Sequence, residues 1–154
     1  MTPYLAIDPG ASGGFAWQLS DSDLAQAKSM QKDNKKNAEF IQSFNLASKT
    51  PKVIIEDVPS FAGENRPGAR MFPLGFNCGL LEGASLACLM TVIKIRPHEW
   101  QKHFNIGGRS DYECTQGWKR RLKEHAQLLF PYLKVTLKTA DALLLLAYAK
   151  NKHL

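Results

Sequence analysis

The chain has 154 residues, of which 44% are hydrophobic and 22% are charged. This size and composition exclude a disordered or fibrous protein and predict one domain over residues 1–154. The formal net charge is +6, and it is uneven: residues 1–58 carry 6 basic and 7 acidic side chains, whereas residues 59–154 carry 14 and 7. A basic half beside a neutral half suggests a polyanionic partner, although a basic face that only aids solubility gives the same pattern.

No segment has the pattern of a signal peptide or a membrane span. The longest purely apolar run, residues 142–149, is far too short to cross a bilayer. The three cysteines are an odd number at unrelated spacings, so they predict ordinary thiols rather than a disulfide framework. We therefore expect a cytoplasmic protein that does not contact a membrane.

The hydrophobic pattern predicts an alternation of strands and helices. In chain order we expect strands at 3–8, 14–19 and 24–30, a helix at 34–47, a strand at 53–58, a helix from about 72 to 90, a strand at 91–95, and helices from 97, from about 116 to 130 and from 139. The first two strands form a hairpin, and the later strands follow helices as in parallel crossovers. The predicted fold class is α/β, with a mixed central sheet and helices on its faces.

Two segments stand out from this alternation. Residues 59–75 are rich in Gly and Pro, and a loop of that length is a functional candidate. The helix at 116–130 is expected to bury Trp118, Leu122, Ala126 and Leu129 and to carry a basic cluster on its other face.

Three acidic residues occupy positions that do not suit structural acids. Asp8 and Glu56 each end an apolar strand, and Asp141 lies in the first turn of a nearly apolar helix. If the two strands are neighbours, Asp8 and Glu56 converge at the carboxyl edge of the sheet. Taken singly, Asp8 could be a turn residue and Asp141 an acid that suits the helix dipole. Together on a basic domain, the three carboxylates favour a Mg²⁺ site, with Mn²⁺ as a substitute, of the kind that cleaves phosphodiesters.

The chain resembles the RuvC-type Holliday junction resolvases, which belong to the RNase H-like nuclease superfamily. The resemblance lies in AIDPG at 6–10, IIE at 54–56 and ADAL at 140–143, with G-x3-G at 79–83 and RP-x2-W-x-K at 96–102 as in phage and prophage members. It covers nearly the whole chain in the right order and spacing. It implies an RNase H-like fold, a homodimer, and Mg²⁺-dependent paired nicking of four-way DNA junctions that leaves a 5′-phosphate and a 3′-hydroxyl.

The resemblance also implies roles for individual residues. Asp8 would bridge two metal ions, with Glu56 holding one and Asp141 the other. The family usually has an acid or a histidine three residues before the last aspartate, where this chain has Lys138. At that spacing Lys138 would point toward the same site, where it could contact the scissile phosphate, orient the water or pair with Asp141.

Basic and aromatic side chains outside the acidic site are candidate DNA contacts, although each could equally be solvated surface or, for phenylalanine, core. The candidates are Phe61, Arg66, Arg70, Lys102, Arg109, Lys119, Arg120 and Lys123, with Phe72 as a weaker stacking candidate. The small residues Gly79, Gly83 and Ala87 lie on one side of a helix, which could pack on a second copy of the chain or on the sheet.

Other functions stay open. The same site could serve an RNase H-like nuclease that acts on other branched DNA or on RNA–DNA hybrids. A catalytically silent junction-binding protein is also compatible with Lys138. A sugar-kinase-like or actin-like enzyme needs two lobes around its nucleotide, and 154 residues supply one.

Overall fold

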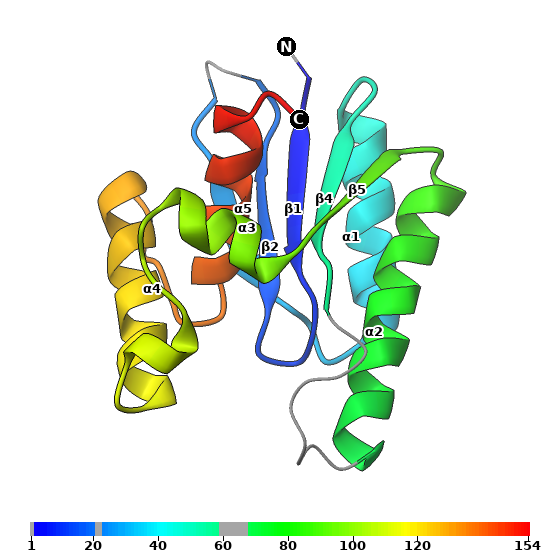
Figure 1. Cartoon of the computed structure of the whole chain (residues 1–154). Coiled ribbons are helices and arrows are strands. Elements are labelled where there is room, and N and C mark those ends of the chain that lie inside the picture. Colours follow the sequence, from blue (N-terminus) through cyan, green and yellow to red (C-terminus); the bar gives the residue numbers. More distant parts are fainter. Residues whose placement is uncertain (1, 21–22, 59–67) are drawn as a thin grey trace.

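A computed structural model describes residues 2–20, 23–58 and 68–154 of the chain. Its centre is a five-stranded mixed sheet in the order β3-β2-β1-β4-β5 (Figure 1). The strands are β1 (Tyr4–Asp8), β2 (Gly14–Gln18), β3 (Gln26–Ser29), β4 (Lys52–Glu56) and β5 (Thr91–Ile95). The first three are antiparallel, whereas β4 pairs parallel with both β1 and β5. The mixed α/β sheet that the sequence predicts is confirmed.

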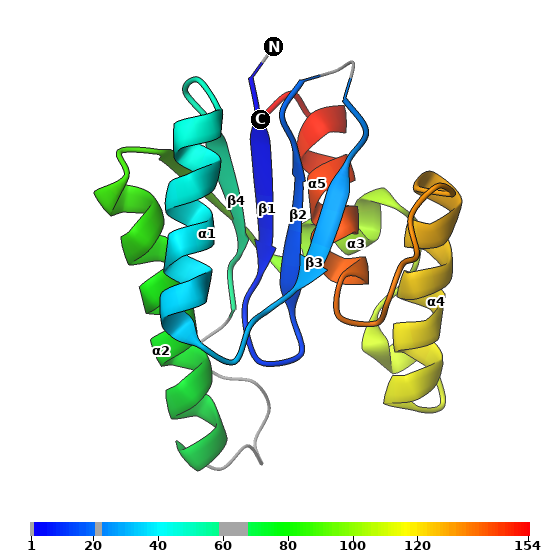
Figure 2. The ribbon, with the colours of Figure 1, turned by 180° about the vertical axis from the view of Figure 1, so that it is seen from behind.

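Helices cover both faces of this sheet, as Figures 1 and 2 show from opposite sides. The helices are α1 (Asn34–Ala47), α2 (Gly68–Ala87), α3 (Pro97–His103), α4 (Thr115–Leu129) and α5 (Ala140–Asn151), with a 3₁₀ turn η1 at Arg109–Asp111. One face packs on α1 and α2 through Leu5, Ile7, Val53 and Ile55. The other packs on α5 through Ala6 and Ile54, because alternate strand residues point to opposite faces.

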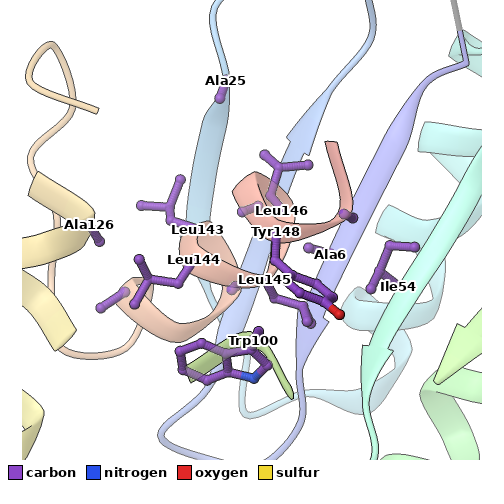
Figure 3. Packing of buried hydrophobic residues seen from close by; sticks show 14 of the residues in the cluster. Ala6, Ala25, Ile54, Trp100, Ala126, Leu143, Leu144, Leu145, Leu146 and Tyr148 are labelled. Atoms are coloured by element: carbon purple, nitrogen blue, oxygen red, sulfur yellow. The ribbon is translucent and has the colours of Figure 1, made fainter. Parts of the chain in front are cut away.

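Helix α5 is the centre of the second layer. Residues 140–146 of this helix are all buried, and Figure 3 shows Leu143, Leu144, Leu145 and Leu146 surrounded by side chains from β1, β4, α3 and α4. A helix that is apolar on every side needs such a position between the sheet and other helices. No helix in the described part of the chain has the length and apolar character needed to cross a membrane.

The structure corrects the predicted limits of the long loop. Helix α2 begins at Gly68, so the second half of the predicted loop at 59–75 is helical and includes Pro73. Pro73 is the sixth residue of α2, and because it has no N–H it removes one i→i−4 hydrogen bond from the helix. Asn77 also holds this helix against the hairpin turn, because its Oδ1 accepts a hydrogen bond from the Gly10 N–H at 2.8 Å. Arg70 and Phe72 are therefore helical rather than loop residues.

The predicted burial of α4 is correct in part. Leu122 and Ala126 are fully buried and Trp118 packs on the same core, but Leu129 is 42% exposed. Leu129 is the last residue of α4.

Candidate functional site

The pairing of β1 with β4 brings two carboxylates to one edge of the sheet. Their register places Ile7 opposite Ile55, so Asp8 and Glu56 follow at the carboxyl ends of neighbouring parallel strands. Both point to the face covered by α5, because they alternate with Ile7 and Ile55, which face α1 and α2. The predicted convergence of Asp8 and Glu56 is confirmed.

The third carboxylate comes from α5 and faces the same cleft. Asp141 is only 5% exposed in the first turn of the helix. It lines a cleft of about 610 Å³ together with Asp8 and Glu56. Helix α5 packs on β1, β2 and β4, and this packing fixes where Asp141 enters the cleft.

Close approach of the backbone around Asp8 requires glycine in the hairpin turn. A side chain at Gly13 would collide with the Asp8 carbonyl oxygen, and one at Gly14 would lie 2.7 Å from the carbonyl oxygens of Lys28 and Lys138. Gly10 has a φ of +107°, which L-residues with side chains rarely adopt. The turn can therefore pack against the segment that precedes α5.

Burial and the repulsion between carboxylates disfavour the charged forms of Asp8 and Glu56. Burial raises the pKa of Asp8 well above its usual range, and the charges of Asp141 and Glu56 raise it further. Burial and Asp141 raise the pKa of Glu56 to about 7, although the Trp100 hydrogen bond and Lys119 act against the shift. A cation bound in the cleft would offset this repulsion and favour the ionised forms of the two carboxyls.

Two side chains already stabilise the carboxylates. The Trp100 indole Nε1–H donates to Glu56 Oε2 at 3.0 Å, and Trp100 itself is fully buried. The Lys119 ammonium pairs with Asp141 Oδ2. Burial acts to lower the pKa of Lys119, but the attraction and hydrogen bond of Asp141, with Asp8 and Glu56, raise it above its ordinary value.

The cleft also contains unpaired polar atoms. Asp141 Oδ1 and the Trp118 indole Nε1 are buried without a hydrogen-bond partner in the described structure. A buried acceptor without a partner is costly and suits a ligand site. Both residues line the cleft that also holds Asp8 and Glu56.

The donor set fits a hard divalent cation. Asp8, Glu56 and Asp141 offer only oxygen ligands, which suit Mg²⁺ or Mn²⁺ rather than zinc. The free Asp141 Oδ1 provides an acceptor that no protein group satisfies. Among the described residues, however, no three His, Cys, Asp or Glu side chains already form a metal cage. The Lys119 ammonium takes part of the charge-neutralising role at Asp141.

Lys138 lies elsewhere than the helical spacing predicts. Helix α5 begins at Ala140 with Thr139 as its N-cap, so Lys138 lies in the turn that precedes the helix rather than in the helix itself. Its side chain is exposed and lines a hollow beside the cleft rather than the cleft itself. Pairing with Asp141 is one of the three roles that the sequence leaves open for Lys138, and in the structure Lys119 makes that ion pair.

The predicted DNA contacts fall into several groups. Arg109 and Lys119 line the acidic cleft, and the Arg109 Nε–H is held by Thr115 Oγ1 at 2.8 Å. Arg70 lines the hollow with Lys138, and Lys102 lines a third cavity beside α3. Arg120 and Lys123 lie on the outer side of α4. Phe61 and Arg66 lie outside the described residues.

Sequence reasoning missed the roles of two side chains at this site. Trp100 belongs to the RP-x2-W-x-K motif, but no local pattern connects it to Glu56, 44 positions earlier. Lys119 did leave a signal, because it precedes Leu122 by three residues and Ala126 by seven. That spacing places Lys119 on the buried face of α4, so it belongs to the site rather than to the outer basic face.

Comparison with known proteins shows which solved structures have a similar fold. No family model and no curated protein matches the sequence. The structure is similar to that of Thermus thermophilus RuvC, with a TM-score of 0.56 and 14% identity over 99% of this chain and 97% of that one. It is also similar to T. thermophilus RuvC in complex with a Holliday junction substrate, with a TM-score of 0.58 and 9% identity over the same shares of the two chains. The yeast mitochondrial Holliday junction resolvase Ydc2 matches at a TM-score of 0.47 and 13% identity, covering 99% of this chain and 81% of that chain.

The similarities to the two RuvC structures define the class of fold. The chain has an RNase H-like α/β fold, as the sequence predicts. The similarity to the two RuvC structures extends over nearly the full length of both chains.

Proposed function

We propose that the chain is a metal-dependent DNA endonuclease that resolves four-way junctions by paired symmetric nicks, leaving a 5′-phosphate and a 3′-hydroxyl. The observation that carries this proposal is the meeting of three carboxylates from β1, β4 and α5 in one cleft of a basic RuvC-like fold. The similarity to RuvC bound to a Holliday junction supports the choice of substrate.

In this proposal each carboxylate has a distinct surrounding. Asp8 lies at the centre, affected by the charges of both other acids, and would bridge two Mg²⁺ ions. Glu56 would hold one ion with the oxygen that Trp100 does not occupy, and Asp141 would hold the other. Divalent ions at such a site activate water and stabilise the leaving oxygen of a phosphodiester.

The cations of the cleft complete the site. Lys119 is close enough to Asp141 to pair with it and is 36% exposed, so it can also face a DNA phosphate. Arg109 is held by Thr115 and by the Tyr112 carbonyl oxygen, which orients a fixed guanidinium toward the same cleft. An ordered cation loses little side-chain entropy when it contacts a phosphate.

A homodimer would form through the exposed face of α2. The buried face of this helix carries Asn77, Leu81 and Ser85. Gly79 and Gly83 lie on the exposed side, and a side chain added at either would meet no atom within 4 Å. The small residues therefore leave room for the close approach of a second helix rather than packing on the sheet.

One observation favours a second candidate function. The ion pair with Lys119 offsets the charge of Asp141, so the chain could bind junctions without cutting them. A nuclease with broader branched-DNA substrates would share the same cleft.

A cleavage assay separates these candidates. A four-way junction, a flap and a linear duplex are incubated with Mg²⁺, Mn²⁺ or EDTA, and Asp8→Asn serves as the inactive variant. We expect symmetric, ligatable nicks in junctions alone, lost in EDTA and in Asp8→Asn, which still binds the junction. Cutting of flaps or duplex would broaden the substrate. Tight junction binding without cutting in either metal would support the silent binding protein.

A further inference from the structure

The turn that follows Asp8 forms one wall of the acidic cleft. Every residue from Asp8 to Gly13 lines the cleft, and Asp8 pairs with Gly14 at the base of the turn. The Gly13 N–H donates to the Gly10 carbonyl oxygen at 3.0 Å and closes the turn from within. Because Asp8 is the last residue of β1, the backbone of this turn helps to determine where its carboxylate lies.

Helix α2 contacts this turn at two points, both at Gly10. Asn77 Oδ1 accepts from the Gly10 N–H at 2.8 Å, and a Cβ added at Gly10 would lie 3.1 Å from Leu74 Cδ1. Leu74 and Asn77 are three residues apart, so both contacts come from one side of the helix. A hydrogen bond and a packing contact therefore fix Gly10, which lies two residues after Asp8.

The hydrogen bond of Asn77 differs from those of two other buried polar side chains in its reach. Asn77 is 9% exposed, and its partner is 67 positions away. Asn37 bonds to the backbone of Gln31, six positions away, and Ser85 donates to the Leu81 carbonyl oxygen in its own helix. Those bonds stabilise local structure, whereas the bond of Asn77 joins α2 to the turn beside the carboxylates.

We propose that Asn77 is a positioning residue of the nuclease site, acting on Asp8 through Gly10. By accepting from the Gly10 N–H, it fixes the turn and holds the Asp8 carboxylate toward the other two acids of the cleft, where the three can share a cation. Without the bond the Gly10 N–H loses its partner, and the turn can leave the conformation that Gly10 adopts at a φ of +107°. This inference rests on the proposed metal-dependent nuclease function.

Hydrogen exchange in the metal-free chain tests the bond itself. Asn77→Ala removes the acceptor, and Asn77→Leu removes it while filling a similar space, so loss of the bond and loss of packing are separated. In both variants the Gly10 amide should exchange about 2–10-fold faster than in the wild type, as expected for one lost hydrogen bond. Asn77→Asp keeps an acceptor and should restore the protection. Unchanged exchange of Gly10 in Asn77→Leu would overturn the proposal.

Titration calorimetry with Mg²⁺ then separates positioning from general stability. The affinity should fall about 2–10-fold in Asn77→Ala and Asn77→Leu, and should return at least to the wild-type value in Asn77→Asp. Ser85→Ala is the matched control, because it removes a buried hydrogen bond from the same helix without touching the turn, and its affinity should equal that of the wild type. An equal loss in Ser85→Ala, or no loss in the Asn77 variants, would show that the bond only supports the helix.

Junction cleavage distinguishes a failure of this inference from a failure of the proposed function. At limiting Mg²⁺, Asn77→Ala should cut more slowly than the wild type, while its junction affinity in EDTA should be unchanged. A loss of junction affinity with unchanged Mg²⁺ affinity would assign Asn77 to the DNA surface and overturn the proposal. A wild type that binds Mg²⁺ but cuts no branched DNA would refute the nuclease, whereas Asn77 variants that match the wild type would refute only this inference. A wild type that binds no Mg²⁺ would refute both.

Discussion

The acidic cleft should lower the stability of the metal-free protein, and Glu56→Gln tests this. The pKa of Glu56 is raised from 4.5 to about 7. Between these values the folded chain keeps a proton that the unfolded chain has lost, so the free energy of unfolding falls as pH rises through this range. Each pKa unit corresponds to about 1.4 kcal/mol, which gives a destabilisation of about 3 kcal/mol once Glu56 is ionised.

Glutamine removes this cost without removing the hydrogen bond, because its side-chain oxygen can still accept from the Trp100 indole. In EDTA, Glu56→Gln and the wild type should therefore have the same free energy of unfolding near pH 4. At pH 8 the variant should be more stable than the wild type by about 3 kcal/mol. For a chain of this length that difference corresponds to about 6–12 °C in Tm.

The assay is thermal and urea unfolding followed by circular dichroism between pH 4 and 8. Glu113→Gln makes the same chemical change at an exposed position and should follow the wild type at every pH. Adding Mg²⁺ should reduce the difference in the free energy of unfolding between the two proteins, since the ion stabilises the wild type more than the variant. A difference that does not grow with pH would refute the argument that burial and repulsion raise the pKa of Glu56.

Three further substitutions test the surroundings of the cleft. Trp100→Phe keeps the buried ring and removes the donor to Glu56, so calorimetry should show metal affinity reduced about 10–100-fold, whereas Trp17→Phe should not change it. Lys119→Met leaves the Asp141 charge unpaired and should lower the free energy of unfolding of the metal-free protein by about 2–3 kcal/mol. The loss is smaller than for a fully buried pair because the lysine is 36% exposed, and Mg²⁺ should restore most of it. A Cβ added at Gly83 meets no atom of its own chain within 4 Å, so Gly83→Arg should fold. If the chain dimerises through this face of α2 as proposed, light scattering should show a dimer for the wild type and a monomer for the variant, and a variant that stays dimeric would exclude this face.

Most of the fold could be predicted because each signal is local. The helix at 34–47 and the strand at 91–95 have the predicted bounds, since an N-cap aspartate at position 33 and β-branched residues define them. The start of α2 was not predictable from local rules, because Gly and Pro there indicate a loop. The contact between Asn77 and the Gly10 backbone, 67 positions apart, is tertiary.

The candidate site also has a part that local signals predict and a part that depends on tertiary packing. The positions of Asp8 and Glu56 followed from two strand ends and one assumption about pairing, which the parallel register bears out. The side chains that pair with the carboxylates could not be predicted from the sequence in this way. Whether Lys119 or Lys138 reaches Asp141 depends on how α4 packs against α5 and on where α5 begins, and neither is encoded in a short motif.

Metal binding by this site should release protons, and the amount should depend on pH. Near pH 7 the Glu56 carboxyl is about half protonated in the metal-free chain, and burial favours the protonated form of Asp8 as well. Metal ligation requires the deprotonated forms, so binding must expel those protons. Titration calorimetry with Mg²⁺ at pH 7, in buffers that differ in ionisation enthalpy, should give an apparent enthalpy that changes with the buffer. The number of protons released from Glu56 should be close to zero at pH 9, where this carboxyl is already ionised. The apparent affinity for Mg²⁺ should fall as the pH drops below 7. Binding that is equally tight and buffer-independent at pH 6 and pH 9 would show that the ion does not use the raised carboxylates, and would place the metal away from Asp8 and Glu56.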